Sequence, residues 1–259
     1  WLAWYLTTAA EPLRINTPKD RGLPLFRPGG GLLGEALLAH PLRFRNRLQG
    51  AFVAIGERSA FDASVSRVVS LMSNQAAAAI DLIELLEANM RLALHDGLTG
   101  LLNRRAFDEA LERSVAQSAR TEQPLSLLML DLDHFKRLND TYGHSIGDLA
   151  LQAAAEEIRH QVRGGDLAAR YGGEEFAVIL PDTDGPAAFR MAERLRAALA
   201  DRVVHAPEDD LRITASCGVS ATDLGYTTPE TLVRSADEAL YASKETGRNR
   251  TSLAGSPRS

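Results

Sequence analysis

Residues 60–95 contain neither glycine nor proline, and this uninterrupted run limits the folds open to the chain. The run predicts a single helix about 50 Å long at 1.5 Å per residue. Apolar side chains recur along it every seven residues, at Val65, Met72, Ala79, Leu86 and Ala93. Such a heptad repeat is typical of a helix that pairs with a second copy, although packing on its own domain is an alternative. We expect packing in the first half and a parallel dimer in the second.

This helix divides the 259-residue chain into two regions. Five of the eleven prolines lie in the first 41 residues, which predicts a turn-rich start. Alternation over 42–48 and an apolar run over 51–55 predict two strands joined at Gln49-Gly50. Four aromatic residues of this region fit a core better than a pocket lining: Trp1, Trp4, Tyr5 and Phe26.

Composition restricts the partners and the compartment. A net charge of −5 argues against non-specific nucleic-acid binding, which needs a basic surface. The single cysteine, Cys217, excludes an internal disulfide, fits a reducing cytoplasm and is expected to be a core residue rather than a nucleophile. No apolar run reaches the roughly 18–20 residues of a membrane span. Because the chain begins at Trp1, we expect a fragment whose preceding part could include a membrane region.

Strands and helices alternate in the second region. Strands are predicted at 125–130, 167–171, 176–180 and 211–219, and helices at 150–161, 186–200 and 229–244. The nearly continuous apolar run of 125–130 predicts a central strand covered on both faces. Alternation by itself favours a parallel sheet within an α/β or α+β domain.

Two acidic residues follow the central strand in the sequence LDLD. If the strand ends at Asp131, its carboxylate and the carbonyl of Leu132 are free to meet a cation, and Mg²⁺ prefers such oxygen ligands. A solvated strand end is the alternative. The segment RYGGEEF, residues 170–176, predicts a two-residue hairpin turn in which both glycines take positive φ. Glu174 would then meet Asp131, and Mg²⁺ would relieve their repulsion.

The segment HFKRLNDTYGHSIGD, residues 134–148, holds further polar candidates. Asn139 and Asp148 carry the donor and acceptors that match the edge of guanine, although each residue type also caps helices and turns. Near the end of the last helix, Lys244 and Arg248 either satisfy the helix terminus or clamp a triphosphate.

Four segments together resemble the signatures of the GGDEF-domain diguanylate cyclases: DGLTGLLNRRAF, LDLDHFKRLNDTYGHSIGD, RYGGEEF and ADEALYASKETGRNR. The resemblance covers residues 92–253. It implies a palm-like domain with a mostly antiparallel central sheet flanked by helices, in place of the parallel sheet. We expect a domain at 96–253, a linker helix at 60–95 and a tail at 254–259. Residues 1–59 would be part of an α/β sensor that resembles the C-terminal portion of a GAF domain, with an unknown ligand.

The resemblance also implies the roles of the site residues. Two Mg²⁺ ions, or Mn²⁺, would be held by Asp131, the Leu132 carbonyl and Glu174. Glu174 would accept the proton of the attacking hydroxyl, with Glu175 as a further catalytic candidate and metal ligand. The remaining residues would bind GTP: Asn139, Asp148 and His144 at guanine, Phe135 lining the pocket, and Lys136, Lys244 and Arg248 at the phosphates. Two domains, each with one GTP, would form cyclic di-GMP and pyrophosphate in a homodimer.

Arg163 and Asp166 match the RxxD motif at which relatives of this family bind their product. The resemblance therefore implies product inhibition, with Arg194 as a second contact, whereas the residues alone fit a loop ion pair. A non-catalytic receptor for cyclic di-GMP is the rival hypothesis. A cyclase for other nucleotides is disfavoured because Asp148 keeps the acid that reads guanine.

Overall fold

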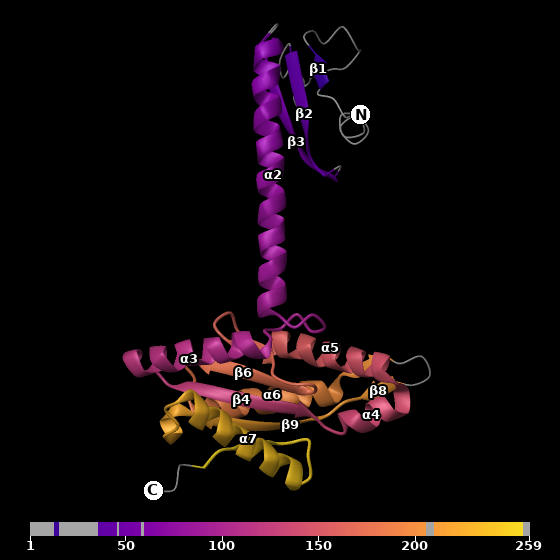
Figure 1. Cartoon of the computed structure of the whole chain (residues 1–259). Helices are drawn as coiled ribbons and strands as arrows, with labels where there is room; N and C mark the ends of the chain where they lie inside the picture. The colour runs from indigo at the N-terminus through magenta and orange to yellow at the C-terminus, as the bar shows by residue number, and fades with distance from the viewer. Residues whose placement is uncertain (1–12, 16–35, 46, 58–59, 206–209, 256–259) are drawn as a thin grey trace, which may run out of the picture. The chain divides into compact units, whose positions relative to one another are not determined.

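The structure is a computed structural model that describes residues 13–15, 36–45, 47–57, 60–205 and 210–255. It divides into two compact units, residues 1–90 and residues 91–259 (Figure 1). The aromatic residues Trp1, Trp4, Tyr5 and Phe26 lie outside the described residues.

The first unit contains a three-stranded antiparallel sheet in the order β1-β2-β3. Its strands are β1 (Leu13–Ile15), β2 (Ala36–Phe44) and β3 (Arg47–Gly56). The prediction of one strand over 42–48 is wrong, because the chain reverses at Arg45, whose φ is 43°. The expected turn at 49–50 is also wrong, because both residues lie inside β3.

Helix α2 (Ala63–Leu94) confirms the predicted long helix. On one side, Ser73 and Ala77 are buried, and Glu84 pairs with Arg47 of β3 at 2.6 Å. Large apolar side chains elsewhere on the helix are exposed: Val65, Val68, Leu71, Met72, Leu82, Ile83, Leu85, Leu86 and Met90. By length and composition alone, the segment Ala63–Leu86 is apolar enough to cross a membrane. The expectation that no apolar run is long enough to do so is therefore corrected for this helix.

The second unit is built on a five-stranded sheet in the order β10-β9-β4-β6-β5. The strands are β4 (Leu125–Leu132), β5 (Leu167–Arg170), β6 (Glu175–Pro181), β9 (Ala215–Ala221) and β10 (Thr251–Leu253). All pairs are antiparallel except β10 with β9, which confirms the mostly antiparallel sheet. The predicted strand 211–219 is instead two strands. Asp210–Arg212 (β8) pairs with Val203–His205 (β7), and β9 begins at Ala215.

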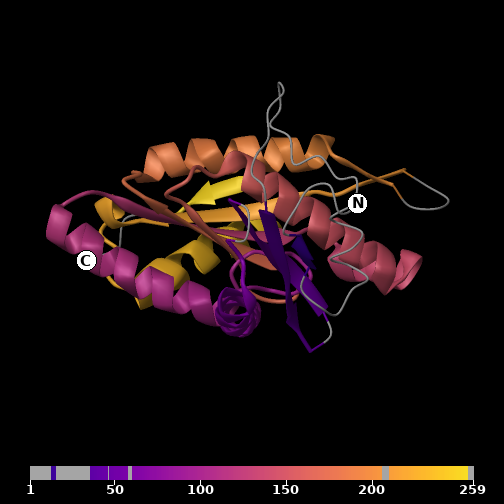
Figure 2. The ribbon, with the colours of Figure 1, turned by 90° about the horizontal axis from the view of Figure 1, so that it is seen from above.

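Helices cover both faces of this sheet (Figure 2). The described helices are α3 (Arg104–Thr121), α4 (Phe135–Tyr142), α5 (His144–Gln161), α6 (Gly185–Asp201) and α7 (Pro229–Glu245). Helix α5 begins six residues before the predicted start at 150. The start of α7 follows from its sequence, because the Thr228 side chain caps the first turn and Pro229 occupies it.

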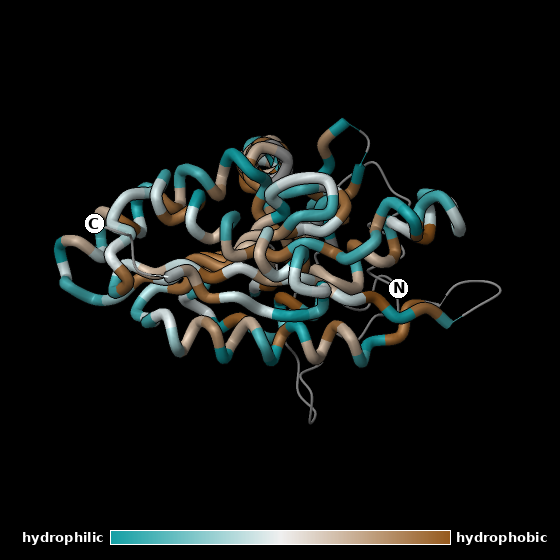
Figure 3. Tube along the Cα trace, turned by 90° about the horizontal axis from the view of Figure 1, so that it is seen from below, coloured by the Kyte–Doolittle hydropathy of each residue, from teal (hydrophilic) through white to brown (hydrophobic). Residues whose placement is uncertain are grey.

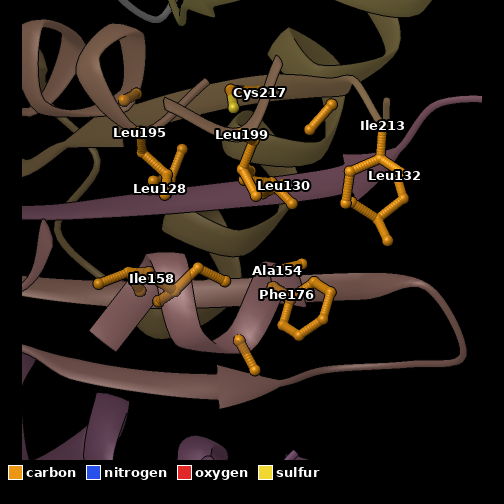
Figure 4. Packing of buried hydrophobic residues seen from close by; sticks show 14 of the residues in the cluster. Leu128, Leu130, Leu132, Ala154, Ile158, Phe176, Leu195, Leu199, Ile213 and Cys217 are labelled. Atoms are coloured by element: carbon orange, nitrogen blue, oxygen red, sulfur yellow. The ribbon is translucent and has the colours of Figure 1, made fainter. Parts of the chain in front are cut away.

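The central strand β4 is fully buried and alternates between two cores. Leu128 and Leu130 pack with α5 and α6 (Figure 4), whereas Leu127 and Met129 pack with α3 and α7. The hydrophobic strands therefore lie between helices whose residues alternate in polarity (Figure 3). On β9, Gly218 has a packing reason, because a Cβ there would overlap backbone atoms of α7.

Candidate active site

The end of β4 places Asp131 on the sheet face that α7 covers. Only 6% of Asp131 is exposed, and its Oδ2 lies 2.8 Å from Nζ of Lys244. Burial raises the pKa of Asp131, the Lys244 ammonium opposes that rise, and the charges of Glu175 and Asp133 add to it. An ion pair within the chain therefore balances a buried carboxylate that has acidic neighbours.

The loop between β5 and β6 brings two glutamates to this carboxylate. In the sheet register Asp131 is opposite Glu175, and the Leu132 amide donates to the Glu174 carbonyl at 3.3 Å. The predicted two-residue turn with positive φ is wrong, because four residues connect the strands and neither glycine has positive φ. A Cβ at Gly172 would lie 2.6 Å from Oε2 of Glu175, a contact that a small movement of the flexible glutamate side chain would relieve.

Arg170 braces this loop from the preceding strand. Its guanidinium donates to the Gly173 carbonyl at 2.7 and 3.1 Å and pairs with Asp96 at 3.2 Å. Asp96 in turn accepts the amide and hydroxyl of Thr99. The turn that opens the domain and the GGEEF loop are thus fixed by one arginine.

Acidic groups crowd together at this point. Burial raises the pKa of Glu174, and the carboxylate of Asp131 raises it further. Among the described residues, no group of three or more His, Cys, Asp or Glu side chains has metal-binding geometry. The expected donor set is smaller, with two carboxylates and the Leu132 carbonyl. Oxygen donors in a repulsive, half-buried cluster are chemically suited to a hard divalent cation.

The expected guanine residues come from α4 and α5. Phe135 is buried, and Oδ1 of Asn139 is a buried acceptor with no hydrogen-bond partner among the described residues. Gly147 lies against both, because a Cβ there would overlap Oδ1 of Asn139. The sequence analysis missed Gly147, although the segment GHSIGD contained it. His144 and Asp148 are exposed in the first turns of α5.

Three cationic residues were expected at the phosphates, and their surroundings in the structure differ. Lys136 is exposed on α4, and Lys244 is paired with Asp131. Arg248 is exposed on the loop after α7, with a φ of 61°. Lys244 therefore already has a partner in the ligand-free chain, whereas Lys136 and Arg248 extend into solvent.

The RxxD residues lie at the opposite end of β6. Arg163 bonds Asp166 at 3.2 Å, the Pro181 carbonyl at 3.0 Å and the Thr183 hydroxyl at 2.5 Å. Arg163, Asp166 and Arg194 line one pocket of about 470 Å³. Arg190 of α6 also lines it and was missed by the sequence analysis, because no motif marks that position.

Comparison with known proteins places this site within a family. The family model described as "Diguanylate cyclase, GGDEF domain" matches residues 93–250. The chain belongs to the GGDEF family. The domain is 46% identical over 169 residues to diguanylate cyclase DgcP of Pseudomonas aeruginosa, covering 65% of this chain and 25% of that protein. Diguanylate cyclase A of Treponema denticola is 36% identical over 220 residues, covering 82% and 58%.

A solved structure of the GGDEF family has the same architecture. The coiled coil and GGDEF domain of DgcB from Caulobacter crescentus, solved in complex with c-di-GMP, is 35% identical with a TM-score of 0.66. The match covers 72% of this chain and 99% of that one. The chain spans only 25% and 58% of the two curated relatives named above.

Proposed function

We propose that this GGDEF protein condenses two molecules of GTP into cyclic di-GMP and releases pyrophosphate. The observation that carries the proposal is the cluster of Asp131, at the end of β4, and Glu174, just before β6. Burial raises both carboxyl pKa values, the charge of Asp131 raises that of Glu174 further, and the charges of Glu175 and Asp133 add to that of Asp131. Such a cluster is stabilised by a divalent cation and by a substrate that brings one.

In the proposed reaction, each chain binds one GTP and faces a second copy. The 3′-oxygen of each GTP attacks the α-phosphorus of the other, so that two P–O bonds form, the two bonds to the leaving groups break, and two pyrophosphates are released. Glu174 accepts the hydroxyl proton, and Glu175 supports this role from the adjacent position. Mg²⁺, or Mn²⁺ in its place, would be held by Asp131, Glu174 and the Leu132 carbonyl and would neutralise developing charge.

The other residues hold the substrate in the orientation that in-line attack requires. Asn139, Asp148 and His144 bind guanine above Phe135; the unpaired Oδ1 of Asn139 supports this role, because a buried acceptor needs a donor. Lys136 and Arg248 bind the phosphates. Lys244 also binds the phosphates if the incoming divalent cation replaces it as the ionic partner of Asp131.

Incubation with GTP and Mg²⁺, followed by chromatography, tests this function. The chain should produce cyclic di-GMP and pyrophosphate, and the variant Glu174→Gln should not. A chain that makes no cyclic di-GMP and behaves like Glu174→Gln, yet binds cyclic di-GMP, would be the non-catalytic receptor instead.

Dimerisation through α2 is part of the proposal, since each reaction needs two GTP sites. The exposed apolar residues Leu82, Ile83 and Leu86 support it, and the DgcB structure includes a coiled coil. Sedimentation of the full chain should give a dimer, and Leu82→Glu should shift it towards the monomer. The matched change Asn74→Glu on the same helix should not.

Product inhibition and sensing complete the proposal. Cyclic di-GMP would bind the pocket of Arg163, Asp166 and Arg194, where guanidinium groups suit its phosphates and guanines. The region 1–59 would be a GAF-like sensor portion before the helix 60–95 and the catalytic domain 96–253. We place the protein in the cytoplasm, where GTP is available.

A further inference from the structure

The loop after α7 has three consecutive residues in the left-handed region. Gly247 has a φ of 123°, Arg248 of 61° and Asn249 of 44°. This conformation is uncommon for non-glycine residues, more so for arginine than for asparagine, so contacts from the surroundings help to hold Arg248 there. The side chain of Arg248 projects from the middle of this segment, so its position depends on what fixes the loop.

Asp133 holds the loop from the end of β4. Its Oδ2 accepts the Asn249 amide at 3.0 Å and the Thr214 hydroxyl at 2.8 Å, and its Oδ1 accepts the Ser216 hydroxyl at 2.7 Å. Both carboxylate oxygens are therefore engaged. Although Asp131 and Asp133 look alike in the sequence LDLD, it is Asp131 that pairs with Lys244 and raises the pKa of Glu174.

A second support comes from α6. Nη1 of Arg196 donates to Oδ1 of Asn249 at 2.8 Å, and Glu193 accepts from the same guanidinium at 3.0 and 3.2 Å. The Asn249 backbone is thus bound to β4 and its side chain to α6. Together, these contacts fix the residue that directly follows Arg248.

We infer that Asp133, assisted by Asn249 and Arg196, is a positioning residue that holds Arg248 ready for the substrate phosphates and is not a metal ligand. The inference rests on the proposed function, because it requires Arg248 to bind GTP. The two acids of LDLD then have different roles: Asp131 binds the cation, and Asp133 holds the phosphate-binding loop in place.

A double-mutant cycle on the full chain tests this inference. The readout is the affinity for 3′-deoxy-GTP, which lacks the attacking hydroxyl and so separates binding from turnover. Arg248→Ala and Asp133→Asn should each weaken binding about tenfold, the loss expected for one charge-assisted contact. The double variant should be no more than about twofold weaker than Arg248→Ala, because Asp133 acts through Arg248. Additive losses would overturn the inference.

Metal binding supplies an independent readout. Mn²⁺ affinity, measured by electron paramagnetic resonance, should fall in Asp131→Asn and stay unchanged in Asp133→Asn. An equal fall in both variants would make Asp133 a metal ligand and overturn the inference. If Asp133→Asn does not melt cooperatively, Asn249→Gly replaces it in the cycle. That variant tolerates the left-handed backbone but loses the Arg196 contact, and a roughly threefold, non-additive loss is expected.

The exposed Arg234 on α7 supplies the matched control. Arg234→Ala should leave affinity unchanged alone and beside Arg248→Ala, and a loss equal to that of Asp133→Asn would overturn the inference. Failure of the unaltered chain to bind 3′-deoxy-GTP would overturn the proposed function along with it. Normal binding and turnover with an additive cycle would overturn only the positioning role.

Discussion

The two ends of β6 have opposite electrostatic environments. At its start, Glu175 lies opposite Asp131, and acidic groups crowd around one lysine. At its other end, the Pro181 carbonyl accepts from Arg163, whose guanidinium also bonds Asp166 and Thr183. The first end is repulsive within the chain, whereas the second is satisfied before any ligand arrives.

This difference indicates how each end would respond to a ligand. In the proposed function, a cation would add counter-charge at the acidic end, and its residues would serve chemistry at a cost to stability. The basic end already contributes to stability, and a ligand must compete with Asp166 for Arg163. Substitutions should therefore separate activity from stability at the first end, whereas at the second they should weaken product inhibition and cost only a little stability.

The largest effect is expected from Glu174→Gln. Turnover should fall by about 100-fold or more, because the proposed proton acceptor and metal ligand is lost. The melting temperature should stay constant or rise, because repulsion with Asp131 is relieved. Product formation and thermal melts measure the two quantities, with the exposed Glu112→Gln as the control. A large loss of melting temperature would show that Glu174 stabilises the fold and would break the comparison.

A smaller effect is expected from Arg163→Ala at the basic end. Inhibition by added cyclic di-GMP should weaken at least tenfold, whereas activity without product should change less than about twofold. Because 61% of the arginine side chain is exposed, the stability loss should stay below about 1 kcal/mol. Initial rates against product concentration measure the first effect. Unchanged inhibition would show that the pocket does not bind the product.

Asp96→Asn tests the brace of the acidic end. Burial pushes the pKa of Asp96 up, but hydrogen bonds from Thr99 and the charge of Arg170 bring it below its ordinary value. A lowered carboxyl pKa stabilises the fold above the unfolded value of about 3.9, and this contribution is lost as the pH falls through the folded pKa. We expect a loss of about 1–2 kcal/mol near neutral pH.

Urea unfolding at several pH values measures this contribution. The difference between the chain and Asp96→Asn should shrink as the pH falls below about 4. The exposed Asp108→Asn should show no such difference. A gap that is constant with pH would assign the loss to packing rather than to the charge of Asp96.

The smallest effect is expected away from both ends of β6, at the buried Cys217 on β9. Burial raises the pKa of Cys217 to about 12, so almost no thiolate exists near neutral pH. Iodoacetamide at about pH 8 should leave the folded chain unmodified and label it once after unfolding. Rapid labelling of the folded chain would mean that this part of the sheet opens.

Local patterns were sufficient for some long elements, but they did not predict α3 or α4. The run without glycine or proline predicted α2, and the apolar stretch before Asp131 predicted β4, because helix breakers and hydrophobic periodicity act within a few residues. The motifs also named the acids of the site. Patterns failed where a distant partner decided the outcome. The predicted strand 211–219, for example, is two strands in different sheets, with β8 paired to β7 and β9 paired to β4.

The two aspartates of LDLD and the two glycines of GGEE show most clearly what the sequence determines and what the tertiary structure decides. The sequence by itself determined that LDLD ends a buried strand and that GGEE follows in a hairpin. Only the tertiary structure paired Asp131 with Lys244 and Asp133 with the Asn249 amide, and only it showed that Gly172 and Gly173 do not have positive φ. The physical reason is that a carboxylate's role depends on its neighbours, and those neighbours come from segments about 40 to 120 residues away along the chain.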